Sequence, residues 1–499
     1  MRVVLAGYNV DTRTLKRAEE SGISKDHLTP EVISAAYARI SRDPRPVGEL
    51  RQAALDAVEK ARASNRNIVF EMGHHSIAEH AVFNFDVIGL SRLAIEHLER
   101  FRLCSYTEKS QRYITLDHDF VIPDELKNTP LESELLSLIA SQAACYQKIY
   151  QALKARLMEK HPDWEKKKAK KRLLDGWAKE DARYVTLLAT TGQLGLTANA
   201  RNLELMIRRF AGARLAELRN LGTQLHNAGS SVAPSLLLFT ETSSYDTSIS
   251  KDIREFVNAQ APTWNPRASY SQDGASAVRL VDHTPDADRL VAASLLHIAT
   301  NESFEKCKVQ VSGMSVKHLA EIFRLTLKHM QFYDTAPREF EHAHLTFEIV
   351  LSSAAYGQLK RHRMTTQSIQ KYDPGLGYTV PPSIKEAGLT EDFLNHLEKA
   401  ETVYYKIADS LPDVAPYVLT NAHRRRVLMT VNLRELYHFV RLREDAHAQW
   451  DIRIIAKQMK DLASQAMPMS SFLLSGKDTF PEVYKTAYGK PPIFPTPAD

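Results

Sequence analysis

The chain has 499 residues, of which 43% are hydrophobic and 25% charged, with a formal net charge of +5. Its length corresponds to about three average domains or two large ones. The composition is that of a globular protein and excludes a disordered, collagenous or coiled-coil chain. The net charge is too small to indicate nucleic-acid binding and is compatible with small anionic ligands.

The first element is a short apolar strand within the N-terminal sequence MRVVLAGYNVDTRT. This segment turns polar too early for a secretory signal, and no apolar run approaches the ~20 residues that span a bilayer. The cysteines Cys104, Cys145 and Cys307 are odd in number and lack paired spacing, which argues against a disulfide scaffold or a Cys-rich zinc site. We therefore expect a cytoplasmic protein without membrane contact.

Helical periodicity dominates the rest of the chain, and short β-like runs such as AVFNFDVIGL and AHLTFEIVLS interrupt it. The apolar spacing predicts long helices over Pro30–Ala63, Glu134–Lys160, Ala200–Ala228, Val316–Tyr333, Thr390–Asp409 and Leu433–Leu462. The strands and helices do not alternate as in a doubly wound fold, and no Gly-rich phosphate loop is present. The basic run 165–172 (EKKKAKKR) is interpreted as a solvated helix face, with a nucleic-acid or partner surface as the alternative.

Three landmarks occur twice in the same order, which predicts a tandem duplication. Each half has a Glu-His before a β-like run, at Glu79-His80 and Glu341-His342. Each then has an Arg-x-Arg unit, Arg100-Phe101-Arg102 and Arg361-His362-Arg363. Each later has an Asn-x-Arg that opens a helical pattern, Asn199-Ala-Arg201 and Asn432-Leu-Arg434.

A polar stretch rich in Ser, Thr, Asp and Pro separates the two halves, as linkers do. We predict an N-terminal domain over 1–235, a linker over 236–285 and a C-terminal domain over 286–499. Each half is long enough to bury a core of its own. Residues 165–172 have no counterpart in the second half.

The segment 100–113 (RFRLCSYTEKSQRY) combines polar side chains in alternation. If it is extended, Glu108, Ser110 and Arg112 leave the same face of the strand. An arginine, a hydroxyl and nearby backbone N–H groups suit a phosphate, because a guanidinium meets phosphate oxygens bidentately. The alternative is an exposed edge strand whose polar residues alternate for solubility.

The motifs together resemble the flavin-dependent thymidylate synthase family. The first half has Gly73-His74-His75-Ser76, Glu79-His80 and the segment from Arg100 to Tyr113. The second half has Arg361-His362-Arg363, Asn432-Leu-Arg434, Arg443 and His447-Ala-Gln449-Trp450. The resemblance covers nearly the whole chain apart from the linker and the Lys-rich insert. It implies an α+β fold of two tandem copies, each a helix-rich domain around a small, mainly antiparallel sheet.

The resemblance also implies two sets of nucleotide ligands, and the two halves keep complementary sets. The phosphate-side set survives in the first half as Glu108, Ser110, Arg112 and Arg183, whereas the second half has a shortened segment and Pro416 at the position of Arg183. The pyrimidine-side set survives in the second half as Gln358, Arg361 and Arg443. The first half has His97 for the Gln, Phe101 for the motif His and Phe210 for the Arg. We therefore expect one composite live pocket, formed within one chain or between two.

The family's chemistry gives each residue an expected role. Arg443 is the expected catalytic residue, because a guanidinium at the O2/N3 edge of uracil favours the N3-deprotonated, electron-rich ring. The expected FAD residues are His74, Ser76, Glu108, Arg361, His362, Arg363, Asn432, Arg434 and His438. His438 departs from the family's usual Asn. Cys104 is interpreted as a packed residue, since the family uses no cysteine nucleophile. The histidine spacing indicates no zinc site.

The resemblance implies an FAD-dependent thymidylate synthase that makes dTMP from dUMP with methylenetetrahydrofolate and NADPH. It also implies a homodimer that mimics the family's tetramer. One alternative is a related flavoenzyme that modifies another pyrimidine nucleotide at C5, which identification of the product by mass would reveal. The other is a non-catalytic flavin- or nucleotide-binding homologue, motivated by Phe101, His97 and His438; a colourless preparation that takes up no FAD would favour it.

Overall fold

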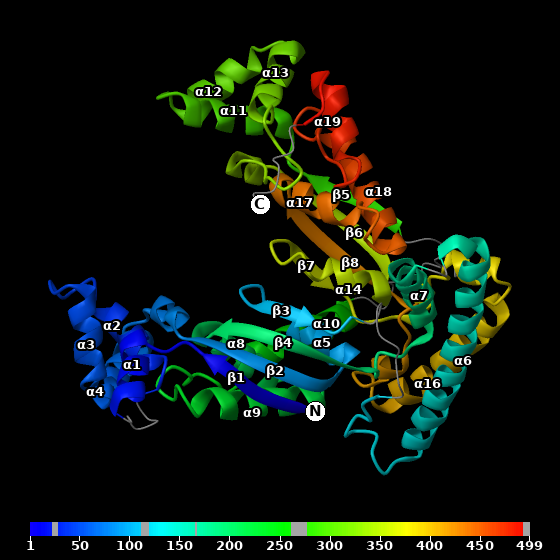
Figure 1. Ribbon diagram of the computed structural model, residues 1–499, viewed down its shortest axis with the longest axis horizontal. Coiled ribbons are helices and arrows are strands. Elements are labelled where there is room, and N and C mark those ends of the chain that lie inside the picture. Colours follow the sequence, from blue (N-terminus) through cyan, green and yellow to red (C-terminus); the bar gives the residue numbers. More distant parts are fainter. Residues whose placement is uncertain (22–27, 111–118, 165–166, 261–276, 493–499) are drawn as a thin grey trace. The chain divides into compact units, whose positions relative to one another are not determined.

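The computed structural model describes residues 1–21, 28–110, 119–164, 167–260 and 277–492. The fold is α+β, with two four-stranded antiparallel sheets among many helices (Figure 1). The strand orders are β1-β2-β4-β3 and β5-β6-β8-β7, so the second sheet repeats the order of the first. The expected α+β fold of two tandem copies is therefore confirmed.

The first sheet contains β1 (Arg2–Tyr8), β2 (Val82–Ser91), β3 (Ser105–Glu108) and β4 (Thr191–Asn199). The second contains β5 (Ala277–His283), β6 (His344–Ser352), β7 (Thr366–Ile369) and β8 (Arg424–Asn432). In both sheets the long central strands bury alternate side chains, with Phe83 and Phe85 of β2 matched by Leu345 and Phe347 of β6. Both β3 and β7 are short edge strands, each paired with one neighbour.

The helices of the first repeat lie before, between and after its strands. They are α1 (Thr12–Ser21), α2 (Glu31–Arg39), α3 (Val47–Leu55), α4 (Val58–Arg66), η2 (Asn67–Glu71), η3 (His75–His80), α5 (Arg92–Leu98), α6 (Pro130–Lys160), η4 (Pro162–Trp164), α7 (Lys168–Ala182), η5 (Arg183–Val185), α8 (Ala200–Ala211), α9 (Ala216–Ser230) and α10 (Ser244–Gln260). Within the described ranges, no helix has the length and apolar character needed to cross a bilayer.

The second repeat follows the same plan with fewer helices ahead of its sheet's central strand. They are α11 (Ala287–Ala299), α12 (Phe304–Ser312), α13 (Val316–Thr326), η6 (Arg338–His342), α14 (Ser353–Leu359), η7 (Pro374–Leu376), α15 (Pro382–Glu386), α16 (Thr390–Ser410), η8 (Ala415–Val418), α17 (Leu433–Arg443), α18 (Trp450–Ala466) and α19 (Phe480–Tyr488). Buried side chains of α11, α14, α17 and α18 share one core with β6 and β8.

Three helices predicted as single are broken in the structure. The stretch predicted over Pro30–Ala63 forms α2, α3 and the start of α4, and the break between α2 and α3 contains Pro44 and Pro46, which cannot continue a helix. The stretch over Ala200–Ala228 breaks between α8 and α9 at Gly212. The stretch over Leu433–Leu462 breaks between α17 and α18, where the Gln449 side chain caps the new helix by accepting from the Ile452 N–H.

The chain forms two compact units that do not follow the repeat boundaries. The first unit contains residues 1–266 and 386–420, and the second contains 267–385 and 421–499. In the first unit α16, although it belongs to the second repeat, packs against α6. The Leu188 and Ala189 N–H groups donate to the Leu419 and Tyr417 carbonyls, which fixes η8 beside the start of β4.

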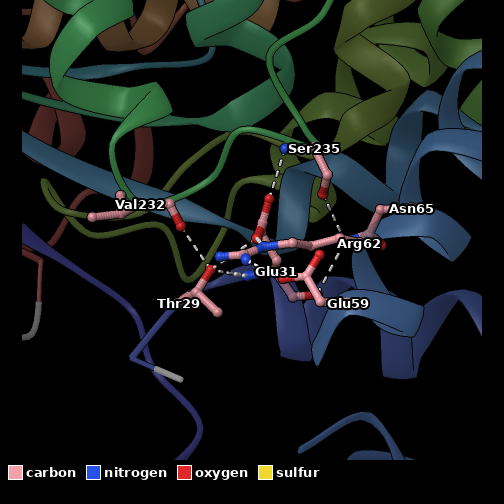
Figure 2. Close-up of polar contacts among 7 residues, drawn as sticks. All are labelled: Thr29, Glu31, Glu59, Arg62, Asn65, Val232 and Ser235. Atoms are coloured by element: carbon pink, nitrogen blue, oxygen red, sulfur yellow. Dashed lines mark hydrogen bonds and ion pairs between the residues drawn. The ribbon is translucent and has the colours of Figure 1, made fainter. Parts of the chain in front are cut away.

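A buried carboxylate ties α2 to α4 and to the segment at Ser235 (Figure 2). Glu31 is fully buried at the start of α2, and its Oε2 accepts from the Arg62 Nε of α4 at 2.6 Å. Its Oε1 accepts from the Ser235 N–H at 2.7 Å. The Ser34 hydroxyl on the same helix donates to the Ile77 carbonyl, so α2 also fixes η3. This arrangement holds the loop that carries His74 and Ser76.

Candidate functional site

Arg443, the expected catalytic residue, lies at the C-terminal end of α17 in a network with His362 and Gln358. Its Nε donates to His362 Nε2 at 2.9 Å, and its Nη1 donates to Gln358 Oε1 at 3.2 Å. Gln358 is at the end of α14, and His362 is in the following turn. The structure therefore joins two residues expected at the pyrimidine, Gln358 and Arg443, to one expected at the flavin, His362.

The His362 ring is 3% exposed and has a partner on each nitrogen. Its Nδ1 lies 3.1 Å from Glu435 Oε1. Burial, together with electrostatic interaction with Arg443 and His438, lowers the pKa of His362 well below its ordinary value. The ring is therefore neutral at physiological pH and carries one proton. Because a guanidinium can only donate, that proton is on Nδ1 and is donated to Glu435.

The side-chain amide nitrogen of Gln358 is buried. Gln358 is 8% exposed, and within the described part of the chain its Nε2 has no hydrogen-bond acceptor. A buried amide N–H without a partner costs about 1–3 kcal/mol. A ligand carbonyl oxygen beside Gln358 would remove that cost, which suits the expected pyrimidine-side role.

Glu435, His362 and His438 place three possible metal-ligand atoms within 4.8 Å of one another. The hydrogen bond from Arg443 makes this set a poor metal site. A metal bound at Nδ1 of a neutral imidazole moves the ring proton to Nε2, where it would face the donor of Arg443. The arrangement suits a hydrogen-bonded network.

The repeated landmarks have a structural explanation in both units. Asn199 and Asn432 are N-caps, and their side chains accept from the backbone N–H three residues later, at Asn202 and Glu435. Arg201 pairs with Glu79 at 2.5 Å, and Arg434 pairs with Glu341 at 2.9 Å. Arg434 Nε also donates to the Ala336 carbonyl. Asn432 and Arg434, expected as flavin residues, therefore also fix the start of α17 and its contact with η6.

The other second-repeat candidates lie around His362. Arg361 is exposed and Arg363 is half-buried, and both occupy the turn between α14 and β7. His438 is exposed on α17, with its ring centroid 5.8 Å from that of His362. Arg361 and Arg363 thus flank the buried histidine in sequence, and His438 lies beside its ring.

The first-repeat candidates lie on two separate elements of the first unit. Glu108 ends β3, and its Oε1 lies 3.5 Å from Arg92 Nη1 of α5. Ser110 follows two residues later, whereas Arg112 lies outside the described residues. Arg183 is 8% exposed and begins η5, at the end of α7. The edge-strand geometry of β3 fits both interpretations of this segment.

His74 and Ser76 lie at the start of η3 and are exposed. The His74 Nε2 lies 3.4 Å from Arg42 Nη2, which follows α2. These two residues, which are expected to reach a flavin from the first repeat, are therefore accessible to a ligand.

The first repeat has an aromatic contact where the second has the Arg443 network. Phe101 occupies the position of His362, and Phe210 occupies that of Arg443. Their ring centroids are 5.6 Å apart with an interplanar angle of 82°, an edge-to-face pair, and Phe210 is 4% exposed. This packing offers no donor to a pyrimidine.

Glu435 is the residue that sequence analysis missed. It stands three residues after the N-cap Asn432, a position that usually indicates helix capping rather than a site. Comparison with the first repeat could have found it, because Asn202 occupies the equivalent position in the half that has Phe101 and Phe210. The glutamate, the histidine and the arginine occur together in the second repeat, and the first repeat lacks all three. This joint occurrence indicates a shared role.

The two similar sheets and the repeated landmarks define a tandem α+β protein, and comparison with known proteins gives the family. The chain matches the family described as thymidylate synthase complementing protein over residues 25–235 and again over 279–469. The chain therefore belongs to this family, with two copies of its domain, as the motifs indicated.

Individual relatives are similar at modest identity. A UPF0159 protein of Chlamydia pneumoniae is 25% identical over 411 residues, which is 80% of this chain and 77% of the relative. A flavin-dependent thymidylate synthase of Clostridium tetani is 31% identical over 214 residues, 42% of this chain and 82% of the relative. A solved structure, the UMP/dUMP methylase PolB from Streptomyces cacaoi, matches at 20% identity with a TM-score of 0.35, over 41% of this chain and 98% of that one.

Proposed function

We propose that the chain is a flavin-dependent thymidylate synthase that converts dUMP to dTMP with methylenetetrahydrofolate and NADPH through bound FAD. Membership of the family and relatives named flavin-dependent thymidylate synthase support this proposal. The structural observation that carries it is the network of Gln358, Arg443 and His362 in the second repeat. At the positions of His362 and Arg443 the first repeat packs two phenylalanines against each other.

We propose that the functional site draws on both repeats, because neither repeat retains both ligand sets. The first would supply the phosphate-side residues Glu108, Ser110, Arg112 and Arg183. The second would supply Gln358, Arg361 and Arg443 for the pyrimidine. Whether they come from one chain or from the two chains of a proposed homodimer, loss of either set should abolish binding.

The residues around His362 fit a flavin dinucleotide in their chemistry. Arg361 and Arg363 place two guanidinium groups in the same turn, exposed and half-buried respectively, and guanidinium groups suit a diphosphate. When bound, FAD supplies the redox chemistry of the reaction. His74, Ser76, Glu108, Asn432, Arg434 and His438 complete the proposed FAD set.

Arg443 would act on the pyrimidine through its charge. A guanidinium beside O2 and N3 stabilises negative charge on the ring, lowers the pKa of N3–H and makes C5 more nucleophilic. Gln358 would hold the ring by donating its buried amide N–H to a carbonyl oxygen. His362 cannot replace Arg443 as the cation, because its burial keeps it neutral.

Release of tritium from C5-labelled dUMP tests the proposed activity. Purified protein containing FAD should release tritium when methylenetetrahydrofolate and NADPH are supplied, because C5 loses its hydrogen as the carbon unit is attached. The product should have the mass of dTMP. No release by protein that binds both FAD and dUMP would contradict the proposal.

A further inference from the structure

We propose that Glu435 is a positioning residue that, through His362, holds the Arg443 guanidinium in its working orientation. This inference rests on the proposed function, in which Arg443 contacts the pyrimidine. The contacts form one continuous series. Glu435 Oε1 lies 3.1 Å from His362 Nδ1, and His362 Nε2 lies 2.9 Å from Arg443 Nε.

The direction of each hydrogen bond follows from the donors available. The Arg443 Nε–H can only donate, so His362 Nε2 must carry a lone pair. The neutral ring then has its proton on Nδ1, which needs an acceptor, and Glu435 Oε1 is that acceptor. Without Glu435, nothing in this series would favour the Nδ1–H tautomer over the Nε2–H tautomer, in which two donors face each other.

The ring is also fixed in space by α17. His362 packs edge-to-face on Phe439, with centroids 4.7 Å apart and an interplanar angle of 73°. Glu435, Phe439 and Arg443 are spaced four residues apart, so they follow one side of the helix in successive turns. The buried His362 ring thus links Glu435 in the first turn of α17 to Arg443 in its last turn.

The first repeat supports the proposal because it lacks the whole series. Phe101, Asn202 and Phe210 occupy the positions of His362, Glu435 and Arg443. Asn202 Nδ2 donates to Asn199 Oδ1, within its own helix cap. A glutamate that served only to cap the helix would have no reason to change along with the His and the Arg.

The proposal also revises the role expected for His362. Both ring nitrogens are used by protein partners, Nδ1 by Glu435 and Nε2 by Arg443. Since a neutral imidazole has one donor and one acceptor, His362 has no further in-plane hydrogen bond to offer a flavin. We infer that it acts through Arg443, and that Arg361 and Arg363 make the direct contacts.

The test uses the full-length protein with FAD and three single variants, Glu435→Ala, Glu435→Gln and the matched control Asn202→Ala in the first repeat. Glu435→Ala should lower kcat for tritium release by about 10–100-fold, with a smaller change in KM for dUMP. Glu435→Gln should restore most of the rate, because its amide oxygen can accept the Nδ1–H. Asn202→Ala should keep the wild-type rate. In a His362→Phe background, Glu435→Ala should cause no further loss.

A spectroscopic measurement separates this inference from the activity. Nitrogen-15 NMR of the imidazoles, with His362 assigned by its absence in His362→Phe, should show Nδ1 protonated in the wild type and in Glu435→Gln. Glu435→Ala should give a mixture of tautomers. A wild-type ring protonated on Nε2, or full turnover by Glu435→Ala, would overturn the proposal. If the wild type shows the expected tautomer but releases no tritium, the proposed function fails while the hydrogen-bonded series stands.

Discussion

At the residue scale, the two repeats differ most sharply at one equivalent position, Arg443 in the second and Phe210 in the first. Arg443 is hydrogen-bonded to His362 and Gln358, whereas Phe210 packs on Phe101. A hydrogen-bonded arginine and a pair of packed phenylalanine rings cannot bind the same ligand. The two repeats therefore share a fold but differ in the residues of the candidate site.

This asymmetry predicts which arginine side chains the proposed activity requires. Arg443→Ala and Arg112→Ala should each lower tritium release by at least about 10²-fold, although they lie in different repeats. Arg100→Ala, at the first-repeat position of Arg361, should cost much less. Initial rates measured at saturating dUMP would compare the three. Equal losses in all three variants would show that both pyrimidine-side positions are in use.

His362 makes the stability of the fold depend on pH. Its folded-state pKa lies well below the ordinary value of 6.5, chiefly because burial disfavours the charged ring. As pH falls below about 6.5, the unfolded chain binds a proton that the folded chain does not, so stability present above this pH is progressively lost. His362→Phe should therefore show a shallower loss of unfolding free energy between about pH 6.5 and 5. Identical slopes in urea unfolding would contradict this expectation.

At the element scale, short polar contacts decide where helices are held. The N-caps Ser91 and Ser352 begin α5 and α14, and each serine hydroxyl also donates to a buried carboxylate, Glu217 or Asp451. Burial raises the pKa of Glu217, although the Ser91 and Tyr417 hydroxyl groups that donate to it oppose the shift. These matching contacts hold the central strand against a following helix in both repeats.

Glu31 provides a direct test of a buried contact between elements. Glu31→Ala should lower the free energy of unfolding by about 3–5 kcal/mol, because Arg62 and the Ser235 N–H lose a buried partner. Glu59→Ala is the matched control, since Glu59 also pairs with Arg62 but its side chain is 84% exposed. The control should cost less than about 1 kcal/mol. Chemical denaturation would measure both; equal effects would show that burial is unimportant here.

At the scale of the whole molecule, the compact units cross the repeat boundary. Residues 386–420 follow the third strand of the second sheet in sequence but pack in the first unit. The side chains of α16 that are buried there include Phe393, Leu397 and Ile407. The chain is therefore not two independent copies joined by a linker.

Cleavage between the repeats tests this organisation. A protease site inserted between residues 261 and 276 should allow the chain to be cut without separating the fragments, because α16 remains packed against α6. The cut protein should elute as one species in size-exclusion chromatography. Fragment 277–499 expressed alone should aggregate, since the apolar face of α16 would be exposed. Two fragments that separate after cleavage and stay soluble would contradict the packing.

Local signals determined much of the fold and of the candidate site. Alternating apolar residues identified β2 and β6, and the twofold occurrence of Glu-His, Arg-x-Arg and Asn-x-Arg identified the duplication. The same motifs assigned Gln358 and Arg443 to the pyrimidine and His362 to the flavin, and the structure joins the three side chains by hydrogen bonds. The helix breaks were missed, because apolar spacing continues across a loop whose own residues also contribute to the core.

The sequence alone thus determined the family, the duplication and the two complementary sets of candidate ligands, because each of these features is recognised from short motifs whose residues are close together in the chain. Only the tertiary structure decided that Glu435 joins His362 to Arg443, that Phe101 meets Phe210, and that residues 386–420 pack with the first repeat. Those contacts join side chains far apart in the chain, and their hydrogen bonds and packing depend on distances and burial that spacing in sequence does not fix.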